Sequence, residues 1–381
     1  MLSYYLVFVF SLIYLTYAHG DKIRDSKPLA VFMTGIALFV GLGDMIGGYD
    51  RYVYGELFDR VADDLRAGTL SDAIIFRLYP REIGYNYWNV LIALITSNRY
   101  IFIFLTTLLI FFLMFMAIKQ YTVNYPLATL VFLGVFYYFT MTYFRQSIAV
   151  GIVWNAIHFI WQRKFWRYLL MVILAATFHN SALIALIAYF VGSRYIPQKK
   201  VFIVLSVSFF VAFTPLATML LTLSGDVLDN VNRGGDYVKD DQGFRIDYVL
   251  EVIVFMLLFK INEKRIPHDK VTMTFVNISY IFCAALLIFM RFGQGGRLGW
   301  FFMIGFIYCL SLFGTVKGRL GDMKLFIVIL SMSLFIRITN SWSPLLEPYK
   351  TFLTNGEPSA ILVYGHYEYD KKYTDNKFYR K

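Results

Sequence analysis

Arginine, histidine and carboxylate side chains stand at the breaks between apolar segments of this chain. Arg145 separates the apolar runs 126–143 and 147–161, and His179 follows the run 165–178. Polar groups in such places are costly inside a bilayer, and they usually mark a site or a water-filled cavity. Arginine offers phosphate oxygens a rigid fork of donors, and histidine or a carboxylate can take a proton at neutral pH. This combination suits chemistry on a group that is linked to a diphosphate.

The candidate site residues come from stretches that the expected topology gathers on one face of a membrane. The candidate catalytic residues are Asp50, Glu82, Arg145 and His179, and the candidate substrate-binding residues are Arg51, Gln146, Asn180, Arg233, Tyr237, Arg291, Gln294 and Arg297. Carboxylates and tyrosines hydrogen-bond sugar hydroxyls, and aromatic rings stack on sugar faces. A lipid-linked diphosphate sugar at the outer leaflet needs all of these groups.

Each of these residues also has a purely structural interpretation. Arg145 at a helix end could extend its side chain so that the guanidinium reaches the membrane–water interface. His179 could cap a turn between two short helices. The others could be loop charges (Asp50, Glu82), interface anchors (Arg291, Arg297) or part of a glycine turn (233–237). What favours a site is the convergence of arginines and carboxylates on one face.

The composition places the chain among integral membrane proteins. Of its 381 residues, 58% are hydrophobic and only 16% are charged, which is typical of that class. The net charge of +11 comes from basic residues clustered between apolar spans, so we do not expect nucleic-acid binding. Cys283 and Cys309 lie in apolar runs and are typical of core residues rather than of a disulfide or metal pair. The run 2–17 lacks a basic leader and a cleavage site, which favours a retained first helix.

The apolar segments predict an all-α, polytopic membrane helix bundle of about 10–12 transmembrane helices, several of them short or broken. The candidate spans are 2–18, 29–46, 101–118, 126–143, 147–161, 165–178, 181–191, 201–223, 248–259, 272–290, 298–316 and 325–339. A shorter amphipathic piece, 87–96, suits the membrane interface. We expect one domain over 1–341, with outer-face loops at 47–86 and 224–247. The polar tail, 342–381, is assigned no structure.

The connections alternate in charge, which predicts the topology. One set is short and basic, as is typical of cytoplasmic loops. Its basic residues are Lys22, Arg24, Lys27, Lys119, Arg163, Lys164, Arg167, Arg194, Lys199, Lys200, Lys260, Lys264, Arg265, Lys270, Lys317, Arg319 and Lys324. The other set is mixed in sign and its basic residues are nearly all arginine, so we expect it, together with the N-terminus, on the outer face.

The sequence lacks the motifs that are typical of several classes of enzyme and binding site. It contains no glycine loop followed by Lys-Ser/Thr, no His or Cys spacing for zinc, and no G-x-S-x-G elbow. The acid pairs 63–64 and 240–241 are adjacent and do not form the Asp-x-Asp motif that would hold a metal and a nucleotide sugar. We therefore expect neither a metal nor a cofactor.

Four stretches resemble one family in order along the chain. They are GGYDRY after the second span, EIGYNYWN at an amphipathic helix, FRQSIAVGI at the Arg145 junction and ATFHNSALIAL at the His179 junction. These stretches are similar to the EpsG family, polytopic bacterial proteins of the exopolysaccharide, capsule and O-antigen polymerase group that are often described as Wzy-like. The likeness covers roughly residues 1–200, and beyond them it rests on the helix pattern and on outer-face arginines.

The resemblance implies a glycosyltransferase of the GT-C type in the bacterial cytoplasmic membrane, which joins repeat units carried on undecaprenyl diphosphate. Arg145 matches the family's FRQ, His179 its FH, and Asp50 and Glu82 its acidic positions, whereas the arginines of 291–297 are placed by topology only. It further implies that arginines hold the diphosphate and that His179, Glu82 or Asp50 is the general base.

Two other function classes stay open at this point. A flippase for lipid-linked glycans would also use broken segments with a histidine at their junction. A membrane acyltransferase would need a histidine base facing a cytoplasmic acyl donor, but the expected topology puts His179 on the opposite side. The expected partners are an undecaprenyl-diphosphate-linked glycan and membrane lipid, and a chain-length-regulating protein is a further candidate.

Overall fold

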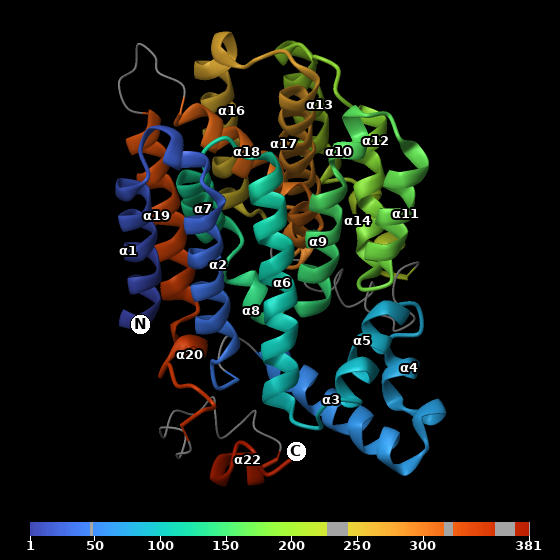
Figure 1. Ribbon diagram of the computed structural model, residues 1–381. Helices are drawn as coiled ribbons and strands as arrows, with labels where there is room; N and C mark the ends of the chain where they lie inside the picture. The colour runs from blue at the N-terminus through green and yellow to red at the C-terminus, as the bar shows by residue number, and fades with distance from the viewer. Residues whose placement is uncertain (46–48, 227–242, 316–322, 355–369, 381) are drawn as a thin grey trace.

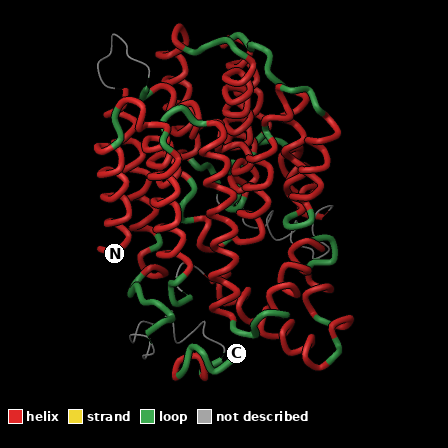
Figure 2. The backbone as a smooth tube through the Cα atoms, viewed as in Figure 1, coloured by secondary structure: helices red, strands yellow, loops and turns green. Residues whose placement is uncertain are grey.

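The computed structural model describes residues 1–45, 49–226, 243–315, 323–354 and 370–380. Within these ranges the chain forms helices and no β-strand, and Figures 1 and 2 show the long helices standing side by side as a bundle. The predicted all-α polytopic bundle is confirmed.

The helices are bounded as follows. They are α1 (Leu2–Tyr17), η1 (Gly20–Arg24), α2 (Ser26–Gly41), α3 (Tyr49–Ala67), η2 (Leu70–Asp72), α4 (Ile74–Leu78), α5 (Ile83–Ala93), α6 (Arg99–Tyr121), α7 (Tyr125–Val135), α8 (Phe139–Thr142), α9 (Phe144–Ala156), α10 (His158–Trp161), α11 (Phe165–Ala176), η3 (Asn180–Ala185), α12 (Leu186–Val191), α13 (Gln198–Val211), α14 (Pro215–Asp226), α16 (Ile246–Asn262), η4 (Glu263–Arg265), α17 (Lys270–Ile288), η5 (Gly295–Phe302), α18 (Met303–Phe313), α19 (Met323–Ser341), α20 (Ser343–Leu346) and α22 (Lys372–Asp375).

Among the described residues, four helices are long and apolar enough to cross a membrane: α6, α17, η5 with α18, and α19. A fifth span is added if α13 and α14, which bend by 89° at their junction, are counted as one. The other apolar helices are shorter, as the sequence predicted for broken segments. The predicted span 126–143, for example, divides into α7 and α8.

A smaller group of helices, α3, α4 and α5, lies at one end of the bundle (Figure 1). We call this group, residues 49–93, the platform. It occupies most of the predicted outer-face loop 47–86, and both termini lie toward the same end (Figure 1). Several short basic turns, including η1 and the connection from α16 to α17, lie at the opposite end (Figure 1). This separation agrees with the charge alternation read from the sequence.

Helix α9 lies at the centre, and nearly all of its residues are buried. It packs against α6, α11, η3 and η5. Close packing elsewhere in the bundle depends on Gly134 at the end of α7, because a Cβ there would lie 2.7 Å from the Ser331 carbonyl oxygen of α19.

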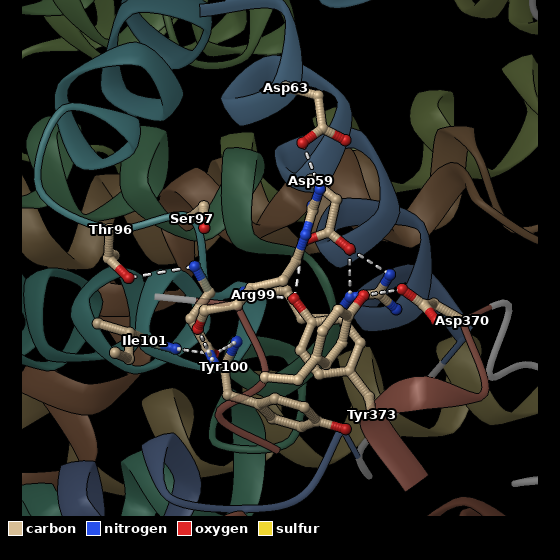
Figure 3. Close-up of polar contacts among 12 residues, drawn as sticks. Asp59, Asp63, Thr96, Ser97, Arg99, Tyr100, Ile101, Asp370 and Tyr373 are labelled. Atoms are coloured by element: carbon tan, nitrogen blue, oxygen red, sulfur yellow. Dashed lines mark hydrogen bonds and ion pairs between the residues drawn. The ribbon is translucent and has the colours of Figure 1, made fainter. Parts of the chain in front are cut away.

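The end of the tail, which the sequence left without structure, packs under the platform (Figure 3). The Asp59 carboxylate of α3 accepts hydrogen bonds from Arg99 Nε at 2.9 Å and from the Tyr373 hydroxyl at 3.0 Å. Burial raises the pKa of the Tyr373 phenol, so the phenol keeps its proton and donates a hydrogen bond to Asp59. Lys377 forms a buried ion pair with Asp44 at 3.1 Å. Charge pairs and a buried tyrosine thus hold residues 370–380, although their composition is polar.

Candidate functional site

A buried ion pair between Arg145 and Glu82 joins the centre of the bundle to the platform. Arg145 lies in the first turn of α9, and Glu82 is the N-cap residue of α5. The Arg145 guanidinium also lies 3.9 Å from the centre of the Tyr79 ring, which adds a cation–π contact. Both charges are buried, so each depends on the other for compensation.

The chain around His179 meets the same cluster. The Asn180 backbone N–H donates to Glu82 Oε1 at 3.3 Å, and the Tyr85 N–H donates to the Thr177 carbonyl at 3.1 Å. Gly84 makes this approach possible, because a Cβ on it would collide with the Thr177 side chain. The EIGYN, FRQ and FHN stretches therefore converge in space, as the predicted site requires.

Asp50 and Arg51 occupy different places in this region. Burial raises the pKa of the Tyr54 phenol, whose ring lies 6.0 Å from the Arg145 guanidinium, and the Asp50 carboxylate adds to that shift. Asp50 lies one turn before Tyr54 on α3. Arg51 instead donates to the Val40 carbonyl at 3.3 Å, so it stabilises the end of α2. Its predicted role in substrate binding stays a prediction.

His179 caps the short helix η3. Its Nδ1 accepts from the Ser181 N–H at 3.3 Å and lies 2.7 Å from the Ser181 hydroxyl. A backbone N–H can donate only to an unprotonated nitrogen, so Nδ1 carries no proton in this geometry. A neutral imidazole then carries its proton on Nε2. His179 therefore caps η3, and its role as a general base stays a prediction.

A cavity of about 550 Å³ lies beside this cluster. Its walls come from the junction of α7, α8 and α9, and from α16, α17, η5, α18 and α19. The charged and aromatic residues that line it are Arg245, Asp247, Glu251, Arg297, Arg337, Phe139, Tyr143, Tyr248, Phe255, Phe282, Trp300, Phe306 and Trp342. A volume of that size lies within the range of small-molecule sites.

The three arginines of the cavity differ in their partners. Arg245 pairs with Asp247 at 2.9 Å, and Arg337 pairs with Glu251 at 2.8 Å. The hydrogen bonds described for the Arg297 side chain go to amide oxygens only, those of Gln146 and Gln294. Because amides do not neutralise it, Arg297 presents a full positive charge to the cavity.

Gln146 connects the buried cluster to the cavity. It follows Arg145 in α9, its Nε2 donates to the Arg297 carbonyl at 3.0 Å, and its Oε1 accepts from Arg297 Nε at 2.9 Å. The Arg297 guanidinium also lies 4.2 Å from the centre of the Tyr143 ring. Residues from α9 and η5 thus fix the Arg297 side chain at the cavity wall.

Of the later predicted site residues, Gln294 and Arg297 line the cavity. Arg291 lies in the turn after α17 and is not part of the lining. Arg233 and Tyr237 lie outside the described residues. Sequence reasoning missed Arg245, Glu251 and Arg337, although a charge within an apolar span, as in VLEVI and FIRIT, was a usable signal.

A family model described as the EpsG family matches residues 27–351. The chain belongs to the EpsG family. The match extends past residue 200, where the motif resemblance weakened, and includes every residue that lines the cavity. No curated protein and no solved structure matches this EpsG protein. Its GT-C-like architecture therefore stays a prediction.

Family membership and the apolar helices identify this EpsG protein as a multi-pass membrane protein associated with polysaccharide biosynthesis. Its cavity combines guanidinium groups for anionic oxygens, carboxylates that accept hydrogen bonds and protons, and aromatic faces for sugar rings. A negatively charged, sugar-bearing ligand matches that lining.

Proposed function

We propose that this protein is a glycosyltransferase that joins oligosaccharide repeat units, carried on undecaprenyl diphosphate, into a surface polysaccharide. The proposed location is the outer face of the bacterial cytoplasmic membrane. The observation that supports the proposal most is the cavity, which holds Arg245, Arg297 and Arg337 together with Asp247 and Glu251. A sugar diphosphate needs both kinds of group in one place.

The chemistry follows from this lining. A hydroxyl of the acceptor unit attacks the anomeric carbon of the donor glycan, so a glycosidic bond forms and the bond from that carbon to the diphosphate oxygen breaks. The diphosphate leaves on its lipid, and the hydroxyl proton passes to a cavity carboxylate, Asp247 or Glu251. Arg297 stabilises the charge that develops on the leaving diphosphate, which is worth most in a site shielded from water.

The Arg145 and Glu82 pair has a positioning role in this proposal. The pair holds the platform against α9 and so fixes Gln146, which in turn orients Arg297. Arg145 is thus a positioning residue, whereas the resemblance had suggested direct contact with the diphosphate. A chain-length-regulating protein remains a proposed partner.

The test is complementation of a strain in which the gene for this protein has been deleted. Arg297→Ala should abolish long-chain glycan at normal protein levels, and single repeat units should accumulate outside the membrane. Arg60→Ala is the matched control, because Arg60 is an exposed arginine on the platform that pairs with Glu56. Long chains in the Arg297→Ala strain would overturn the proposal. Single units accumulating inside would indicate a flippase. A glycan of normal length that lacks acyl groups would indicate an acyltransferase.

A further inference from the structure

Helix α5 of the platform has the reverse of the polarity that is usual for a helix facing water. Its exposed side chains are apolar and share one face, and they are Ile83, Tyr87, Leu91, Leu94 and Ile95. The opposite face is buried and carries amides. Asn86 Nδ2 donates to the Tyr79 carbonyl at 2.8 Å, and Asn89 Nδ2 donates to the Tyr85 carbonyl at the same distance. An apolar face of this extent marks a surface that contacts something other than water.

The membrane-spanning helix α6 gives the depth of α5. Its charged residues, Arg99 at the platform end and Lys119 near the other end, are 20 positions apart. That length is about 30 Å of helix, which equals the thickness of a hydrocarbon core. Trp88 Nε1 of α5 donates to Thr106 Oγ1 of α6 at 3.0 Å. Thr106 is seven positions from Arg99, so the middle of α5 contacts α6 about 10 Å inside its platform end.

Helix α11 gives a second measure of that depth. It begins at Phe165, directly after the basic residues Arg163 and Lys164, and it has 12 residues. Its length is therefore about 18 Å, which is about 12 Å short of the hydrocarbon core. The start of α5 lies against the end of α11, because the Tyr85 N–H donates to the Thr177 carbonyl at 3.1 Å (Figure 1). With 11 residues, about 16 Å, α5 is long enough to cover the remaining distance.

We infer that α5 is a half-span, a helix that crosses only the leaflet on the platform side of the membrane and turns its apolar face to lipid acyl chains. The sequence pattern also suits a helix that lies flat at the membrane interface, but such a helix turns its polar face to water. In α5 the polar face contacts protein, and the described part of the chain leaves the apolar face exposed. At this depth the medium around the protein is hydrocarbon, which matches that face.

The half-span places the ion pair of Glu82 and Arg145 below the membrane surface. Glu82 is the N-cap residue of α5 and marks its deep end, because the other end leads through residues 94–98 to Arg99 at the platform end of α6. Lipid contact along α5 thus holds the pair at a depth where neither charge reaches bulk water, so each depends on the other. This inference concerns how the platform contacts the membrane, and it holds whichever reaction the cavity performs.

The test measures the depth of nitroxide spin labels along the exposed face of α5. The variants, made singly in the full chain, are Ile83→Cys, Tyr87→Cys, Leu91→Cys and Leu94→Cys. Both native cysteines are buried and stay in place, and the labelled parent protein gives the background. Each protein is reconstituted in nanodiscs. Power saturation in electron paramagnetic resonance then gives the collision rates of the label with oxygen, which concentrates in lipid, and with a nickel chelate, which stays in water.

Two further variants calibrate the measurement. Phe112→Cys, at an exposed position within α6, reports lipid. Arg60→Cys, at an exposed position of the platform, reports water, because the neighbouring Asp59 pairs with Arg99 at the end of α6.

We expect the ratio of oxygen to nickel collisions at positions 83, 87 and 91 to exceed that of Arg60→Cys severalfold. The ratio should fall from position 83 to position 94, because a half-span changes depth along its length whereas a flat helix does not. One constant ratio along the face would reject the half-span in favour of an interfacial helix. A ratio like that of Arg60→Cys would also overturn the proposal, and so would few collisions with either reagent, since that result indicates a face covered by protein.

Discussion

Gln146 and Arg297, which are 151 residues apart in the sequence, exchange two hydrogen bonds at 2.9 and 3.0 Å. One bond fixes the Arg297 guanidinium, and the other fixes its backbone carbonyl. Through this pair, helix α9 fixes the position of Arg297 in the cavity wall. Gln146, which is not part of the cavity lining, therefore orients a charged group that is.

The first prediction concerns this pair. Gln146→Ala releases the Arg297 side chain, and we expect a loss of about tenfold in glycan lengthening, because loss of orientation lowers the rate without removing the charge. Gln146→Glu keeps the acceptor for Arg297 Nε but neutralises the guanidinium, so it should weaken inorganic diphosphate binding more than Gln146→Ala does. Gln162→Ala, at an exposed glutamine in the turn after α10, is the control. Equal diphosphate affinities in the two Gln146 variants would contradict this account.

The second prediction separates a positioning role from a catalytic one at the buried ion pair. Glu82→Ala and Arg145→Ala each leave one buried charge without its partner, which costs about 3–5 kcal/mol. Thermal unfolding in detergent should show both variants well below the parent protein. The double variant Glu82→Met with Arg145→Met should be more stable than either single variant, because it leaves no uncompensated charge. If Arg145→Ala melts like the parent protein and yet makes no long glycan, Arg145 contacts the substrate directly.

The third prediction concerns the end of the tail. Tyr373→Phe removes the hydroxyl that donates to Asp59 at 3.0 Å and keeps the ring that lies 4.4 Å from the Arg99 guanidinium. We expect a loss of about 1.5–3 kcal/mol in unfolding free energy, the usual range for a hydrogen bond to a charged group. Asp375→Asn, at an exposed position of the same segment, should leave stability unchanged. A Tyr373→Phe protein as stable as the parent would show that the tail is held by its ion pairs alone.

The fourth prediction concerns the contact between α7 and α19. Gly134→Ala places a Cβ 2.7 Å from a backbone oxygen of Ser331, which cannot rotate away as a side chain can. Overpacking of this kind costs about 1–3 kcal/mol, so the melting temperature should fall. Gly35→Ala in α2 is the matched control, because a Cβ there meets no atom within 4 Å. Equal melting temperatures for the two variants would reject this packing.

The sequence by itself determined the membrane class, the helical fold and the family. Apolar runs interrupted by charge report directly on burial in a bilayer, because the cost of placing polar groups there is large and local. The FRQ, EIGYN and FHN stretches also indicated one cluster, and Glu82, Arg145 and Asn180 do meet. Each of these three stretches lies at the start of a helix.

Only the tertiary structure decided which of these residues reach the cavity. The hydrogen bond that caps η3 places the His179 Nδ1 against Ser181. The buried ion pair turns Arg145 toward Glu82. The cavity lining instead includes Arg245, Glu251 and Arg337, which lie outside the family motifs. These outcomes depend on how distant helices pack. Packing is a sum of many small contacts between segments far apart in the chain, so a local pattern does not encode it.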